Sequence, residues 1–195
     1  MRFVPLGPET QDRGRGIAIL KIVGEGSSET VYTDEVNRFL KGTKFKTFNA
    51  NGGDLQNIWK TTRHLIQNKG IVLMDTDRST PEELLDFKQW CEEKSIALLI
   101  SNPSFEVWLL MHFEDVASAM DQKDLEHSLD RNLGRKYEKS KGIRPDRTMI
   151  LEAIRRAESK IPGNVDVFNY IIGHPGTTMA HLLFKGIPGW GLVPS

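Results

Sequence analysis

The chain has 195 residues, of which 38% are hydrophobic and 27% charged, and its 26 Lys and Arg balance its 26 Asp and Glu. A chain of this length and composition can bury a core of its own, which excludes an intrinsically disordered protein. It has no apolar run of the roughly 18 residues that cross a bilayer and no apolar segment of a secretory signal, so we expect a cytoplasmic protein without a membrane partner; the single cysteine, Cys91, fits that reducing compartment.

Strand and helix patterns alternate along the first 115 residues. Short runs rich in β-branched and aromatic side chains predict strands at residues 16–23, 44–50, 71–75 and 96–102. Helix patterns follow these strands at residues 27–41, 55–68, 81–94 and 103–113. The first helix has Ser27 or Ser28 as its cap, the second has Asp54, and the third has Thr80 before a proline.

The region after residue 115 has helix patterns only. They cover residues 122–133, 147–161 and 177–187, with Gly- and Pro-containing loops between them. Strands that alternate with helices predict an α/β fold with a mostly parallel sheet flanked by helices. We therefore expect an α/β core over residues 1–115 and a helical C-terminal region over residues 116–195 that packs on this core.

Acidic and amide side chains follow the predicted strands. Asp75 and Asp77 close the third strand, Glu25 follows the first, and Asn102 ends the fourth. Because the carboxyl ends of parallel strands meet at one edge of a sheet, these side chains should lie close together. Carboxylates are ligands that Mg²⁺ prefers, and a divalent cation would offset their mutual repulsion. The alternative is that Asp75 and Asp77 only cap the next helix or face solvent.

The loop after the first strand suits a phosphate. Gly24 and Gly26 allow a tight turn, and Ser27 and Ser28 supply hydroxyl groups at a helix N-terminus. The segment lacks the Lys-Ser or Lys-Thr pair of a Walker loop, so an ATP-hydrolysing P-loop is not expected. Glu29, one helical turn further on, either joins the metal ligands or only favours the helix dipole.

Residues 103–113 mainly predict a core helix, with two polar exceptions. Glu106 near a strand end could be a further acid or a metal ligand. His112 lies on a different side of that helix, where a histidine is usually structural. His174 and His181 are seven residues apart, and this spacing does not establish a metal site.

A basic segment covers residues 131–147, although the net charge of the chain is zero. It holds four arginines and three lysines with one aromatic residue, Tyr137. Lys139 and Lys141 lie in this segment, close to Tyr137, and would suit backbone phosphates of a nucleic acid. A solvated loop is the alternative.

Four strings of the sequence together resemble the RloB family, whose core is similar to the TOPRIM domain. They are GEGSSETVY at residues 24–32, MDTD at 74–77, SNPSFEVWLLMHF at 101–113 and GHPGTTMAHLL at 173–183. The resemblance extends from about residue 17 to residue 186, and the third string is its most specific part.

The resemblance implies roles for individual residues. Glu25 takes the position of the TOPRIM glutamate, and Asp75 and Asp77 take the positions of its Asp-x-Asp pair. The roles that the other strings imply are catalysis for Glu106 and His112, and closure of the site or phosphate binding for Asn102, Thr178 and His181. The cluster of Tyr137, Lys139 and Lys141 also resembles the family and implies phosphate binding for the two lysines.

The resemblance also implies an activity. Similar proteins act on phosphodiesters with Mg²⁺ or Mn²⁺ and are linked to anti-phage defence and abortive infection. The expected function is therefore a metal-dependent endonuclease acting on RNA, with tRNA as one candidate, or on DNA. An ATPase or restriction-system partner and a homo-oligomer are compatible with such a role.

Two other functions compete with the nuclease. A TOPRIM-like domain could sense a nucleotide or recruit a partner protein without cutting. A phosphatase of the HAD type is suggested by VLMDTDRS, which approximates that family's strand-end motif with a nucleophilic Asp. Arg78 stands where that motif has Thr or Val, which counts against the phosphatase.

Overall fold

The computed structural model describes residues 18–40, 42–52, 54–66, 70–117 and 120–180. Its strands are β1 (Ala18–Gly24), β2 (Thr43–Asn49), β3 (Gly70–Asp75), β4 (Ile96–Asn102) and β5 (Gly176–Thr177). Its helices are α1 (Ser27–Val36), α2 (Leu55–Leu65), α3 (Pro81–Glu93), α4 (Glu106–Leu110), α5 (Gln122–Leu133), α6 (Arg147–Ser159) and α7 (Val167–Gly173). None of the described helices is long and apolar enough to cross a membrane.

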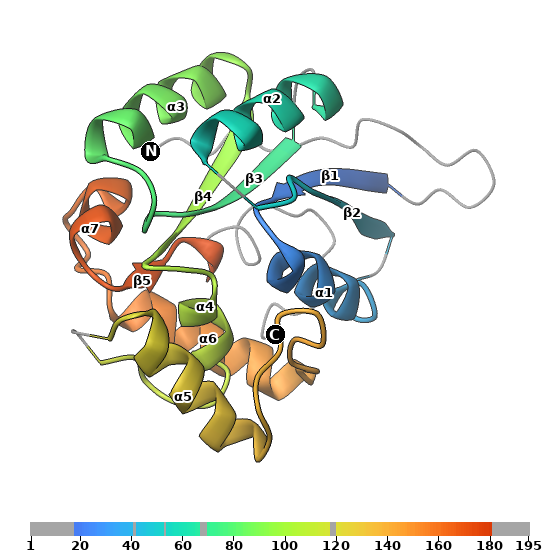
Figure 1. The fold of residues 1–195 in the computed structure, drawn as a ribbon, viewed down its shortest axis with the longest axis vertical. Coiled ribbons are helices and arrows are strands. Elements are labelled where there is room, and N and C mark those ends of the chain that lie inside the picture. Colours follow the sequence, from blue (N-terminus) through green and yellow to red (C-terminus); the bar gives the residue numbers. More distant parts are fainter. Residues whose placement is uncertain (1–17, 41, 53, 67–69, 118–119, 181–195) are drawn as a thin grey trace.

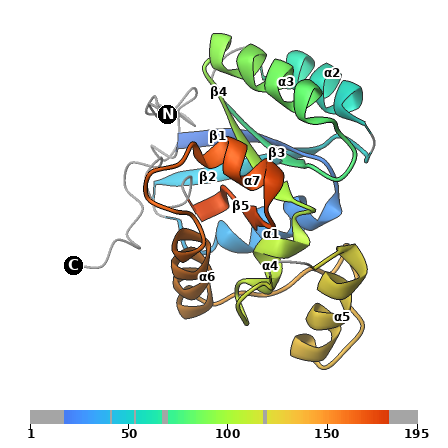
Figure 2. The ribbon, with the colours of Figure 1, turned by 90° about the vertical axis from the view of Figure 1, so that its left-hand side faces the viewer.

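The five strands form one sheet in the order β2-β1-β3-β4-β5 (Figure 1). The first four strands are parallel, and β5 pairs with β4 in the antiparallel direction. Helices cover both faces: α2 and α3 lie on one side of the sheet, and α1, α4 and α6 lie on the other (Figure 2). The predicted α/β class with a mostly parallel sheet is confirmed.

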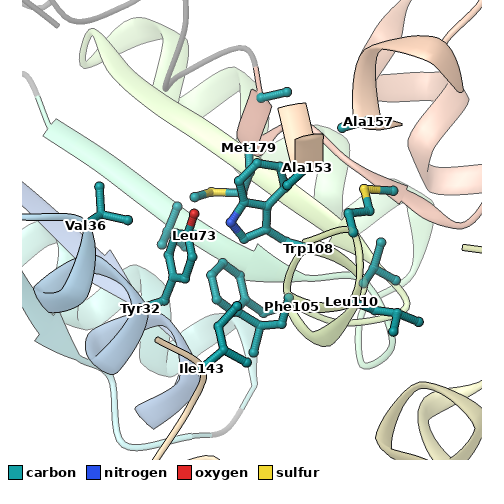
Figure 3. Close-up of a cluster of buried hydrophobic side chains, with 14 of the residues drawn as sticks. Tyr32, Val36, Leu73, Phe105, Trp108, Leu110, Ile143, Ala153, Ala157 and Met179 are labelled. Atoms are coloured by element: carbon teal, nitrogen blue, oxygen red, sulfur yellow. The ribbon is translucent and has the colours of Figure 1, made fainter. Parts of the chain in front are cut away.

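Both faces of the central strands are buried, as expected for a parallel sheet with helices on each side. In β3, Ile71 and Leu73 pack in the cluster with α1, α4 and α6, whereas Val72 and Met74 pack against α2, α3 and α7. The first cluster is centred on Trp108 of α4 (Figure 3). Side-chain alternation along the strands therefore divides the core into two layers.

Two helix starts follow the predicted caps, but the serine cap predicted for the first helix was wrong: the N-cap of α1 is Gly26, and Ser27 and Ser28 are its first two residues. The Asp54 carboxylate accepts a hydrogen bond from the Asn57 amide at 3.0 Å and opens α2. Thr80 and Glu83 bond each other's backbone amides and open α3, with Pro81 at the first position. These pairings satisfy amides that have no partner within the helix.

The helix predicted over residues 103–113 is shorter in the structure. Only Glu106–Leu110 form α4. The amides of His112 and Phe113 instead bond the carbonyls of Leu109 and Leu110 at 3.2 and 2.9 Å, three residues back, which tightens the chain into turns.

The region after residue 115 differs from the sequence analysis in two elements. The helix expected from residue 177 is preceded there by strand β5, and residues 181–187 lie outside the described part of the chain. Helix α7 had no counterpart among the predicted elements. Because β5 joins the sheet and α7 packs on the face opposite α6, this region contributes to both layers of the core. The boundary at residue 115 stays a prediction.

Candidate functional site at the carboxyl ends of β1 and β3

The candidate site lies where two neighbouring strands send the chain to opposite faces of the sheet. Strand β1 leads into α1 on one face, and β3 leads into α3 on the other. Such a switch in direction opens a crevice at the carboxyl ends of the two strands. Glu25 follows β1, Asp75 ends β3, and the Asp75 amide donates a hydrogen bond to Oε2 of Glu25 at 3.3 Å. The predicted meeting of these two strand ends is therefore found in the structure.

A pocket of about 360 Å³ occupies this crevice. The predicted site residues that line it are Glu25, Gly26, Ser28, Glu29, Asp75, Asp77, Glu106 and Lys139. Further lining residues, which sequence reasoning missed, are Gly52, Arg78, Ser104, Phe105, Gln122 and Glu126. Arg78 could have been found, because it directly follows Asp77; Gln122 and Glu126 reach the pocket from α5, and no local pattern marks them.

The start of α1 places a carboxylate against β1. A side chain at Gly24 would meet the Cβ atom of Glu29 at 2.9 Å, so only glycine allows this approach. The Gly26 amide donates to Oε2 of Glu29 at 3.1 Å, which fixes that side chain at the helix start. Burial, followed by the neighbouring Glu106 and Glu25, raises the pKa of Glu29 to about 7.

The strand-end carboxylates are poorly compensated. Burial, and then the neighbouring Glu29, Glu25 and Glu106, raises the pKa of Asp75 well above its usual value. Burial also raises the pKa of Glu25. Arg78 is the nearest cation to Glu25, at 4.0 Å, and its side chain is 62% exposed, so it offsets little of this charge. Negative charge in the pocket is therefore costly in the metal-free protein.

Glu106 differs from these carboxylates because donors surround it. Its Oε1 accepts hydrogen bonds from Ser28 at 2.9 Å and Tyr137 at 3.0 Å, and Nζ of Lys139 lies 3.4 Å away. The amide of Gln122 donates to Oε2 at 3.3 Å. Burial alone would raise the pKa of Glu106, but Lys139, followed by the donors Ser104, Ser28 and Gln122, lowers it, so the group stays charged although only 1% of it is exposed.

The balance of charge fits a divalent cation. Six carboxylates line the pocket against the two cations of Arg78 and Lys139. Within the described residues, no three His, Cys, Asp or Glu side chains are grouped as a complete metal site. Mg²⁺ keeps several waters and commonly takes only one or two protein carboxylates, so Glu25 and Asp75 are the two residues that could hold it. Hard oxygen donors also suit Mn²⁺.

Some predicted site residues do not line the pocket. His112 is buried beside Tyr32, whose hydroxyl bonds Nε2 at 3.1 Å, and Nδ1 lies 2.9 Å from the Trp108 carbonyl oxygen. Burial lowers the pKa of His112 to about 4, so the ring is neutral at neutral pH. Its place in the core beside Trp108, which is drawn in Figure 3, does not bring it to the carboxylates.

Polar residues at the end of β4 bond within the fold. The Asn102 amide donates to the carbonyls of Ile171 and Ile172 at 2.8 and 3.0 Å. The Thr178 hydroxyl accepts from the Ile100 amide at 2.9 Å. Neither residue lines the pocket.

Four more predicted residues complete the comparison. Gly24 lies beneath Glu29, as described, and does not itself line the pocket. Ser27 is exposed on the first turn of α1. Lys141 pairs with Glu138 at 2.7 Å outside the pocket. His181 lies outside the described residues.

Comparison with known proteins gives one finding. Residues 20–185 match the family described as RloB-like protein. Searches of curated proteins and of solved structures gave no significant match.

Proposed function

Because the chain belongs to the RloB-like family, we propose that it is a Mg²⁺- or Mn²⁺-dependent nuclease that cleaves phosphodiester bonds of RNA or DNA. The observation that carries this proposal is the meeting of Glu25 and Asp75, both with raised pKa, at the switch point of the sheet. Carboxylates with perturbed pKa that gather in a crevice are typical of catalytic sites.

Each carboxylate has a role in this proposal. Glu25 and Asp75 hold the cation, and the exposed Asp77 contributes from the rim of the pocket. When bound, the cation stabilises negative charge on the phosphate oxygens. Glu29, with a pKa of about 7, is suited either to join the ligands or to take a proton from the attacking water at neutral pH.

The remaining pocket residues would bind the substrate. Lys139 carries an ammonium group at the pocket, held 3.4 Å from Glu106, and can pair with a phosphate oxygen. Glu106 positions Lys139 and Ser28 in this arrangement, and can approach the cation only if some of its present hydrogen bonds change. A role in anti-phage defence, an ATPase partner and a TOPRIM-type core rest on the resemblance alone.

The test is a cleavage assay with a matched control. Purified full-length protein is incubated with bulk tRNA, single-stranded RNA and plasmid DNA, in Mg²⁺, Mn²⁺ or EDTA. Asp75→Asn removes one charge with little change of shape, and Asp86→Asn makes the same change on the exposed surface of α3. We expect cleavage that needs metal and falls about 1000-fold in Asp75→Asn, corresponding to several kcal/mol of lost metal stabilisation, and that is unchanged in Asp86→Asn.

Two results would contradict a metal-dependent nuclease with this active site. One is cleavage that persists in EDTA or in Asp75→Asn. The other is no cleavage of any substrate while calorimetry detects Mg²⁺ binding that Asp75→Asn abolishes; this result would favour the non-cutting, nucleotide-sensing alternative.

A further inference from the structure

Basic residues are concentrated in one stretch of a chain whose net charge is zero. Residues 36–74 contain seven of the 26 Lys and Arg but only one of the 26 Asp and Glu, namely Asp54. The neighbouring helix α3, by contrast, carries five acidic and one basic side chain in 13 residues. The even overall balance therefore hides a strongly cationic region that covers β2 and α2.

The fold turns four of these cations, Lys44, Lys46, Lys60 and Arg63, outward. In β2, Phe45 is buried against α1, so the alternating Lys44 and Lys46 project from the opposite face of the strand, the face on which α2 lies. Lys60 and Arg63 are exposed on α2, one turn apart. Strand β2 is at the edge of the sheet, and α2 runs above the sheet beside α3 (Figure 1).

Four of these cations have no acidic partner. Within the described residues, Lys44, Lys46, Lys60 and Arg63 form no ion pair, and Lys46 lies 5.3 Å from the ring centre of Phe48. Arg38 of the same stretch pairs with Glu35, and cations elsewhere in the fold commonly pair with carboxylates. A group of unpaired cations on one surface attracts a polyanion by releasing its counterions.

An open hollow of about 640 Å³ lies on the outward face of α2. The described residues that line it are Gln56, Trp59, Lys60, Arg63 and His64. Trp59 is half-buried and is held by Phe87 and Trp90 of α3, with ring centres 5.5 and 5.4 Å away. Cations beside a rigid aromatic ring are the usual surface for single-stranded nucleic acid, whose bases stack while its phosphates pair with the cations.

This surface begins at the edge of the carboxylate pocket. Gly52, in the loop between β2 and α2, lines the pocket, and its amide donates to the Glu25 carbonyl at 2.8 Å. Helix α2 starts at Leu55, three residues further on. A nucleic-acid strand that lies along α2 can therefore continue over Gly52 to the carboxylates of the pocket.

We propose that the outward faces of α2 and β2 bind the backbone of a single-stranded nucleic acid and lead it over Gly52 into the pocket. Binding by this surface rests on the unpaired cations and the hollow. The path into the pocket rests in addition on the nuclease function proposed above.

The experiment measures binding without cleavage. Fluorescence anisotropy in EDTA follows a labelled single strand about 20 nucleotides long, as RNA and as DNA, at increasing salt. Lys60→Glu with Arg63→Glu should raise Kd at least tenfold and reduce the salt dependence of log Kd by about 0.7 for each lost phosphate contact. Lys44→Glu with Lys46→Glu gives an independent pair on β2. Lys94→Glu with Arg155→Glu changes the charge equally on other elements and should leave Kd within about twofold.

The outcomes separate this proposal from the nuclease. Equal loss of affinity in the control pair, unchanged affinity in both test pairs, or a duplex that competes as well as the single strand would overturn the binding surface. Asp75→Asn should still bind. Binding through α2 by a protein that cuts nothing would reject the nuclease and keep the surface, whereas cleavage that is unaffected by Lys60→Glu with Arg63→Glu would reject the path. Thermal unfolding verifies that each variant is folded.

Discussion

Two neighbouring parts of the same sheet edge, the ends of β1 and β3 and the end of β4, carry polar side chains but differ in how these are paired. At the ends of β1 and β3, Glu25 and Asp75 have raised pKa because they are buried with other carboxylates and have weak cationic partners. At the end of β4, Asn102 donates to two carbonyls and Thr178 bonds the Ile100 amide. The ends of β1 and β3 hold charge without a strong partner, whereas the polar groups at the end of β4 are hydrogen-bonded within the fold.

This difference separates function from structure better than residue type does. A buried charge without a partner costs free energy, and a fold retains that cost where a ligand or a reaction needs the charge. A satisfied hydrogen-bond network instead stabilises the chain that it connects. Variants at the β4 end should therefore lower stability and spare activity, and variants at the β1 and β3 ends should do the reverse.

The largest effect on stability is expected at the β4 end. Thr178→Val keeps the shape but leaves the buried Ile100 amide without its partner, which should cost about 1–3 kcal/mol in the free energy of unfolding. Asn102→Ala removes the donor to the carbonyls of Ile171 and Ile172 and should cost a similar amount. Urea unfolding measures both values.

Cleavage provides the decisive comparison for these two variants. Under conditions in which they remain folded, the rate of cutting should stay within about twofold of that of the unmodified protein, because neither side chain lines the pocket. If the folded Thr178→Val variant cut a hundredfold or more slowly, the polar residues at the end of β4 would have to take part in cleavage.

The next effect is a dependence of stability on pH that comes from Glu29. Its pKa is raised from 4.5 to about 7, so the folded state binds a proton that the unfolded state has already released in this range. The resulting stabilisation is complete below pH 4.5 and is lost as the pH rises through about 7. Glu29→Gln should remove a loss on the order of 2–3 kcal/mol between the two ends of this range, as the size of the pKa shift implies, and urea unfolding in EDTA measures it.

Comparison with the unmodified protein isolates this group from others that titrate in the same range. Burial lowers the pKa of His112 to about 4, so the contribution of His112 to the free energy of unfolding falls as the pH falls. This contribution is the same in both proteins. If Glu29→Gln and the unmodified protein had parallel stability profiles, the raised pKa would be wrong. Mg²⁺ should flatten the profile of the unmodified protein, because it stabilises the ionised carboxylates.

Much of the fold could be predicted from local signals. The caps at Asp54 and Thr80 locate two helices, and β-branched runs locate the four parallel strands. Strand β5 could not be found, because a two-residue strand has no periodicity, and it is held by long-range bonds such as that between Ser101 and Thr177. The short α4 depends on turns at its end that no residue type specifies.

The site was predictable only where the parallel orientation of the strands places residues at one edge of the sheet. Strand ends bring Glu25 and Asp75 together through sheet topology alone. The contacts of Glu106 with Tyr137 and Gln122 join segments up to 31 residues apart, and nothing in the local sequence indicates them. Likewise, a polar residue at a predicted strand end does not show whether its side chain, such as that of Asn102, already forms hydrogen bonds within the fold.

The smallest stability effect is expected on the basic loop, where two nearby lysines provide the same comparison on a finer scale. Lys141 pairs with Glu138 on the surface, with both side chains largely exposed, so Lys141→Ala should change the free energy of unfolding by less than about 0.5 kcal/mol. Lys139 pairs with the buried Glu106 but its own side chain is 53% exposed, so Lys139→Ala should cost about 1 kcal/mol and also weaken cleavage, because a pocket cation is lost. Urea unfolding and the cleavage assay measure the two effects. Equal effects of both substitutions on cleavage would show that the loop acts through its general charge, whereas a loss confined to Lys139→Ala would link the basic loop to the pocket through a single ammonium group.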